Sequence, residues 1–174
     1  MNALVAYESM YGNTATIGEA IAASLRRNGL EVEAGPISTI EPSRAGGFEL
    51  LVVGGPTHAH GMSSKATRKS AVEDQKNPYP EPTATPGLRE WMNALPSGSG
   101  RPAAAFDTRF DKPRLLTGSA AKGMSRRLER RGYQLLVPAE SFFVTTENRL
   151  ADGQEAHADA WAADLALRAS TPTA

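Results

Sequence analysis

The stretch ESMYGNT (8–14) separates the apolar run NALVAY (2–7) from the segment ATIGEAIAASL (15–25). A short apolar run followed by apolar residues at helical spacing predicts a buried strand and then a helix. Two hydroxyl side chains, an amide and a glycine occupy the turn between them. Glycine permits a sharp turn, and short polar residues satisfy the first amides of a helix. The sequence therefore predicts a β–α unit at the start of the chain.

The same alternation continues along the chain. Strands are predicted at 3–7, 30–34, 48–55, 101–108 and 141–146, the last with an earlier start at 133–137. Helices are predicted from Thr14 to a stop at Gly29 and at 63–75, 87–95, 118–131 and 154–169. Alternating strands and helices are typical of a parallel sheet covered on both sides. We therefore expect an α/β fold with a three-layer, doubly wound, five-stranded parallel sheet.

Length and composition limit the classes of protein that need to be considered. The 174 residues suit one domain at 1–170 with a frayed tail at 171–174, and the proline-rich segment 77–86 is interpreted as a surface excursion. The absence of cysteine excludes disulfides and thiolate chemistry. Nineteen basic and nineteen acidic residues do not indicate a nucleic-acid surface. With no long apolar run or secretion signal, we expect a cytoplasmic protein without a membrane span.

The turn at 8–14 is a candidate phosphate site. In a doubly wound sheet, ligands lie beyond the carboxyl ends of the strands, where a helix N-terminus offers unpaired amides to an anion. Ser9 and Thr14 can donate hydroxyl hydrogen bonds, Asn13 can add an amide, and Gly12 allows close backbone approach. No Lys or Arg occurs in the turn, which suits a phosphate monoester better than a triphosphate with magnesium. The alternative is an ordinary turn in which Thr14 caps the helix.

The segment LVAYESMYGNTATIGEAIA (4–22) resembles the first strand, phosphate loop and first helix of the flavodoxin-like family. Its S-M-Y-G form is similar to that of the flavodoxin-like NAD(P)H:quinone oxidoreductases, and Tyr11 stands where electron-carrier flavodoxins place a third hydroxyl donor. The resemblance implies the strand order 2-1-3-4-5 and FMN as the cofactor. It also implies a phosphate loop made of Ser9, Met10, Tyr11, Gly12, Asn13 and Thr14.

The segment GGPTHAHGMSS (54–64) resembles the second flavin-contacting loop of these oxidoreductases, through their P-T-x-x-x-x-M-S pattern. The resemblance implies that Thr57 to Gly61 line the isoalloxazine ring. The cofactor-binding residues expected here are Pro56, Thr57, His58 and Gly61. Alternatively, His58 and His60 are solvent-exposed loop residues. A metal is not expected, because two imidazoles without a further ligand make a poor zinc site.

The segment FDTRF (106–110) stands where the family completes its flavin pocket, although it departs from the family's glycine-rich pattern. We expect Asp107, Thr108 and Arg109 to contact the cofactor, with Phe110 as a stacking surface. Arg109 could offset negative charge on a reduced flavin, or it could form a surface ion pair with Asp107. The residues at 117–119 suit a helix cap better than a second anion site.

The resemblance implies an FMN-binding flavodoxin-like protein in electron transfer or flavin-dependent reduction, with no assigned acid–base residue. A redox partner protein or NAD(P)H would supply or accept electrons, and the oligomeric state stays open. One alternative is a dedicated electron carrier, although such carriers are usually acidic and this chain is neutral. The other is a non-enzymatic interaction module with weak or lost FMN binding. The basic cluster RRLERR (126–131) is interpreted as a solvated helix face rather than a docking site.

Overall fold

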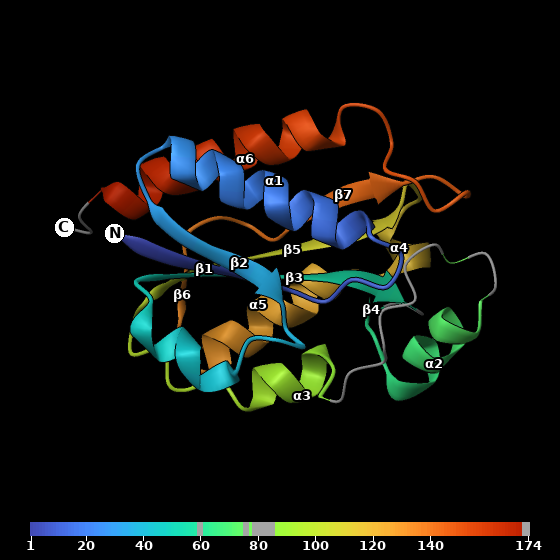
Figure 1. Cartoon of the computed structure of the whole chain (residues 1–174), viewed down its shortest axis with the longest axis horizontal. Coiled ribbons are helices and arrows are strands. Elements are labelled where there is room, and N and C mark those ends of the chain that lie inside the picture. Colours follow the sequence, from blue (N-terminus) through green and yellow to red (C-terminus); the bar gives the residue numbers. More distant parts are fainter. Residues whose placement is uncertain (59–60, 75–76, 78–85, 172–174) are drawn as a thin grey trace.

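A mostly parallel sheet lies between two layers of helices in the computed structural model, which describes residues 1–58, 61–74, 77 and 86–171 (Figure 1). Its strands are β1 (Asn2–Tyr7), β2 (Glu31–Pro36), β3 (Leu50–His58), β4 (Gly61–Met62), β5 (Pro102–Phe110), β6 (Gln134–Leu135) and β7 (Glu140–Val144). The helices are α1 (Asn13–Arg27), the 3₁₀ helix η1 (Pro42–Gly47), α2 (Lys65–Glu73), α3 (Leu88–Asn93), α4 (Arg114–Thr117), α5 (Ala120–Arg130) and α6 (Gln154–Ser170).

The strand order confirms the predicted doubly wound sheet. The order is β2-β1-β3-β5-β6, and β7 pairs in parallel with the second half of β5. The fifth strand is therefore split into β6 and β7, and the break contains Pro138, which cannot donate a backbone hydrogen bond. The chain leaves β1 on one side for β2 and on the other for β3, so the carboxyl end of β1 is the switch point where ligands bind in such sheets.

Both faces of the sheet are buried, which explains why the central strands are almost wholly apolar. Successive side chains of a strand point to opposite faces. Ala3 and Val5 therefore join the core beneath α1 and α6, whereas Leu4 and Ala6 join the core beneath α3 and α5 (Figure 1). Both tryptophans are buried: Trp161 lies in the core beneath α1 and α6, and Trp91 lies in the core beneath α3 and α5.

The sequence-based expectations fail mainly at short elements. The helices η1 and α4 were not expected, and β4 pairs antiparallel with the end of β3 where a loop was expected. No helix in the described ranges is long and apolar enough to cross a bilayer. The expected surface excursion (77–86) lies outside the described residues except for Asn77 and Pro86, and the expected frayed tail lies outside them except for Thr171.

Gly54 tests how closely β3 and β5 pack. A Cβ atom at Gly54 would lie 2.1–2.6 Å from the ring atoms of buried Phe106, whereas one at Gly47 would have no atom within 4 Å. We expect Gly54→Ala to lower the free energy of unfolding by about 1–3 kcal/mol through overpacking. Gly47→Ala should leave it unchanged or raise it by up to about 1 kcal/mol. Urea unfolding of both variants checks this, and equal stabilities would contradict the described packing.

Candidate functional site

The turn between β1 and α1 presents unpaired backbone amides. Gly12 is the N-cap of α1 and has a left-handed backbone with φ 86°, and the Ser9 hydroxyl accepts a hydrogen bond of 3.2 Å from the amide of Ala15. Within the described part of the chain, the amides of Gly12, Asn13 and Thr14 have no hydrogen-bond acceptor. Unpaired amides at the start of a 15-residue helix form an anion-binding site.

The polar side chains of this turn fix its position. The hydroxyls of Thr14 and Thr108 share a buried hydrogen bond of 2.7 Å, which joins the turn to β5. Thr14 lies inside α1, so the alternative that it caps the helix is wrong. The Asn13 side-chain amide donates to the carbonyl of Asn148 at 2.9 Å and joins the turn to the segment after β7. The turn is therefore held at the carboxyl edge of the sheet.

The Tyr11 hydroxyl bonds to a carboxylate at the end of α2. The hydroxyl donates to Asp74 Oδ2 at 3.1 Å. Burial, and then the hydrogen bond and negative charge of Asp74, raise the pKa of Tyr11 above its ordinary value. Tyr11 therefore remains a neutral phenol at physiological pH.

A pocket of about 250 Å³ opens beside this turn, at the carboxyl ends of β1, β3 and β5. This volume is slightly below the roughly 300–1,000 Å³ of small-molecule sites, so a larger ligand would remain partly exposed. Its lining residues are Met10, Tyr11, Asn13, Thr14, Pro56, Thr57, His58, Thr108, Arg109, Phe110, Val144 and Asn148. Ser9 and Gly12 line a neighbouring hollow against α1. Gly61 and Asp107 line neither of the two.

The second predicted segment forms the hairpin of β3 and β4. The Thr57 hydroxyl donates to Asp107 Oδ2 at 2.9 Å and accepts from the amide of Ala120 at 2.8 Å. His58 lines the pocket, and burial lowers its pKa below the ordinary value, so its imidazole is neutral at pH 7. His58 is therefore not the solvent-exposed residue of the alternative interpretation, and His60 lies outside the described residues.

Asp107 is fully buried and occupies the N-terminus of α5. Its Oδ2 accepts hydrogen bonds from Ser119 Oγ at 2.8 Å and from the amide of Ala121 at 2.9 Å, in addition to that from Thr57. Ser119 is the N-cap of α5, which confirms the predicted cap. Asp107 and Arg109 are both buried and form no ion pair among the described residues, so the surface ion pair is wrong.

Arg109 extends along the end of β5 toward the segment that carries α4. Its Nη1 donates to the carbonyls of Phe110 and Lys112 and to Thr117 Oγ1, at 3.3, 2.7 and 3.1 Å. The guanidinium carbon lies 4.9 Å from the centroid of the Phe143 ring. Phe110 is 41% exposed at the rim of the pocket, where a large apolar ring is available for contact with a ligand.

Two lining residues, Val144 and Asn148, were not expected from the sequence. Both lie at or beyond the end of β7, the strand that pairs with the second half of β5. A signal was present, because the carboxyl ends of parallel strands meet at one edge of a sheet and the end of the fifth strand belongs to that edge. Asn148 also has a left-handed backbone, with φ 55°, which is typical of a tight turn.

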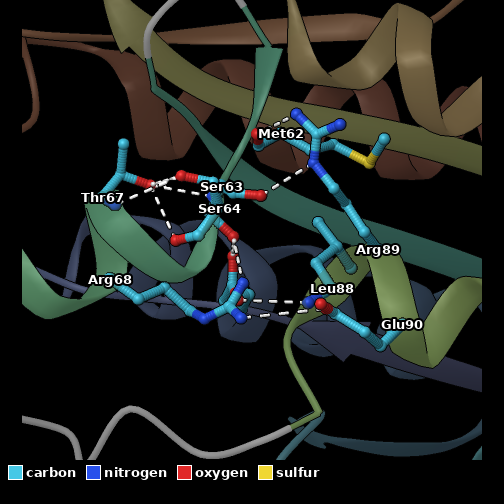
Figure 2. Close-up of polar contacts among 9 residues, drawn as sticks. Met62, Ser63, Ser64, Thr67, Arg68, Leu88, Arg89 and Glu90 are labelled. Carbon is cyan, nitrogen blue, oxygen red and sulfur yellow. Dashed lines mark hydrogen bonds and ion pairs between the residues drawn. The ribbon is translucent and has the colours of Figure 1, made fainter.

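Polar contacts of two arginines, Arg68 and Arg89, hold β4 and the residue after it, Ser63 (Figure 2). Arg68 of α2 lies 3.3 Å from Ser63 Oγ and 3.8 Å from Glu8 Oε1, and Ser63 also donates to the Glu8 carboxylate. Arg89 of α3 donates to the carbonyls of Met62 and Ser63 at 2.6 and 2.9 Å. These contacts join α2 and α3 to the hairpin that borders the pocket.

Comparison with solved structures establishes the fold. The structure matches a flavodoxin from the domain Archaea with a TM-score of 0.69 and 16% identity, covering 98% of this chain and 100% of that one. Flavodoxin 1 from Bacillus cereus matches with a TM-score of 0.68 and 19% identity, and the match covers 94% of this chain and 96% of that one. A mutant form of the flavodoxin from Pseudomonas aeruginosa matches with a TM-score of 0.71 and 16% identity, and the match covers 98% of this chain and 100% of that one. No family model and no curated protein sequence matches.

The protein therefore has the flavodoxin-like fold. It also matches the flavodiiron core of Flv1 from Synechocystis with a TM-score of 0.64 and 18% identity, covering 97% of this chain but 36% of that one. The fold thus occurs both as a separate flavodoxin chain and as part of a larger protein.

Proposed function

We propose that this chain binds FMN without a covalent bond and takes part in electron transfer or flavin-dependent reduction. The observation that carries this proposal is the set of unpaired amides at Gly12, Asn13 and Thr14, at the start of α1 and beside a pocket at the switch point. An anion there accepts hydrogen bonds that the chain itself leaves unmade. A phosphate monoester on a flat, largely apolar group matches this combination.

The residues of the chain fit FMN in separate regions. The amides after Gly12 would hold the phosphate together with the Ser9 hydroxyl, which accepts from the amide of Ala15 and donates to no described residue. Pro56, His58 and Phe110 would border the ring with apolar surface. When bound, FMN supplies the ability to accept and release electrons, and the protein tunes that chemistry through nearby charges and hydrogen bonds.

The remaining residues predicted to bind the cofactor would mainly shape the pocket rather than bond to FMN. The hydroxyls of Thr57 and Thr108 and the Oδ2 of Asp107 bond to other protein groups, and so these atoms would set the shape of the pocket rather than bind FMN. Gly61 would act through the hairpin of β3 and β4. Met10 and Tyr11 would cover the space beside the phosphate.

Absorption and reduction assays of the purified protein test the proposal. We expect flavin absorption with about one FMN per chain, or saturable uptake of added FMN. Oxidation of NAD(P)H with a quinone acceptor would favour a reductase, whereas cytochrome reduction that needs a partner protein would favour an electron carrier. A colourless protein that takes up no FMN would refute the proposal, and the interaction module would then be the remaining interpretation.

A further inference from the structure

The charge of Arg109 is unusual among the residues of the pocket. Arg109 is 7% exposed, its Nε is buried without a hydrogen-bond partner, and only its Nη1 donates to described residues. It forms no ion pair with a described carboxylate. Buried cations are normally paired, because removal from water without a counterion is costly. The arrangement leaves a partly unsatisfied guanidinium at the wall of the pocket.

The other described residues of the pocket do not neutralise this charge. None of the lining residues carries a carboxylate. His58 is neutral at pH 7 because burial lowers its pKa, and the pKa of Tyr11 is raised, so neither adds charge. The acidic residue of β5 is Asp107, which does not line the pocket: its Oδ2 accepts hydrogen bonds from Thr57, Ser119 and the start of α5, and its Oδ1 is buried without a described hydrogen-bond partner. Arg109 is therefore the one described lining residue of the pocket that carries a formal charge at pH 7.

We propose, on the basis of the FMN site inferred above, that Arg109 makes this pocket bind reduced, negatively charged flavin more tightly than oxidised, neutral flavin. A hydride from NAD(P)H carries two electrons and one proton, and its transfer to neutral flavin leaves NAD(P)⁺ and a flavin with one negative charge. The guanidinium at the wall of the pocket stabilises that charge. Tighter binding of the reduced state raises the reduction potential of the bound flavin.

This preference distinguishes two uses of the same fold. A site that stabilises the two-electron-reduced anion is suited to accept hydride from a nicotinamide coenzyme and pass electrons to a second substrate. A dedicated carrier that delivers electrons at low potential needs the reverse, a site that binds the oxidised state more tightly. The position of Arg109 therefore favours a flavin-dependent reductase over a carrier.

The reduction potential of bound FMN tests this inference. We expect the wild-type protein to bind reduced FMN at least about tenfold more tightly than oxidised FMN, a shift of about 30 mV above free FMN for a two-electron couple. Arg109→Gln should remove most of that shift, and Arg109→Lys should keep it because the cation remains. Arg126→Gln, which removes an exposed cation from α5, should leave the potential unchanged.

Two outcomes would overturn the inference in different ways. If Arg109→Gln still binds FMN and its potential equals that of the wild type, Arg109 has no electrostatic role although the FMN site stands. If Arg109→Gln does not fold or does not bind FMN, the wild-type protein alone decides. A reduction potential of its bound FMN below that of free FMN would then overturn the inference. Failure of the wild-type protein to bind FMN would overturn the proposed function as well.

Discussion

Replacing Gly12 with valine should weaken FMN binding by at least about 100-fold, since two charge-assisted hydrogen bonds contribute about 1.5–3 kcal/mol each. Gly12 has φ 86°, a conformation that a β-branched residue rarely adopts. The new side chain would move the turn and separate the amides of Asn13 and Thr14 from the phosphate. Fluorescence titration with FMN measures the change.

Gly29 provides a matched control at the other end of the same helix. Its φ is 89°, and a Cβ atom there would meet no atom within 4 Å. Gly12→Val and Gly29→Val should both lose about 1–3 kcal/mol of stability through the same backbone strain. Gly29→Val alone should retain wild-type FMN affinity. If the two variants bind FMN equally well, the phosphate is not held at Gly12.

Arg68→Met should lower the free energy of unfolding by about 3–5 kcal/mol, because it leaves the buried carboxylate of Glu8 without its cation. Arg68 is 5% exposed, and its guanidinium nitrogens lie 3.8 Å from Glu8 Oε1 and 3.8 Å from Glu90 Oε2; Figure 2 shows Arg68 beside Glu90. Leu88 donates its amide to Glu8 at 3.2 Å, so the loss would also loosen the start of α3. Chemical denaturation measures the change.

Two further variants show whether the loss of stability in Arg68→Met comes from the buried pair of Arg68 and Glu8. Glu8→Gln combined with Arg68→Met should lose less stability than the sum of the single changes, with a coupling of about 1–3 kcal/mol. Arg168→Met breaks an exposed pair with Asp164 on α6 and should cost about 0.3–0.5 kcal/mol. A loss below about 1 kcal/mol in Arg68→Met would mean that the pair is not buried as described.

The regular part of the fold was predictable because its signals are local and repeated. The apolar runs of β1, β3 and β5 are buried on both faces, and α6 extends one residue beyond the end predicted from its apolar spacing. The short elements η1, α4 and β4 lack such periodicity. Gly61 and Met62 become a strand only because the end of β3 offers them backbone partners, which is a property of the tertiary structure.

The positions of site residues were predictable where those residues directly follow a strand. Their hydrogen-bond partners were less predictable, because the partners lie far away in the sequence. Thr14 and Thr108 were placed at the correct edge, but their hydrogen bond joins positions 94 residues apart. The direction of Asp107 depends on the N-terminus of α5, which donates to its carboxylate. A linear pattern gives the position of a polar residue in the sheet, and the packed neighbours decide which groups it contacts.

The most direct test of the account compares the affinities of FMN and riboflavin for the purified protein. The two ligands share the ring and differ in the phosphate, so their difference isolates the turn at 8–14. The unpaired amides after Gly12 predict that FMN binds at least about tenfold more tightly, since a hydrogen bond to a charged group contributes about 1.5–3 kcal/mol. Equal affinities, or no binding of either ligand, would contradict the assignment of this turn as a phosphate site.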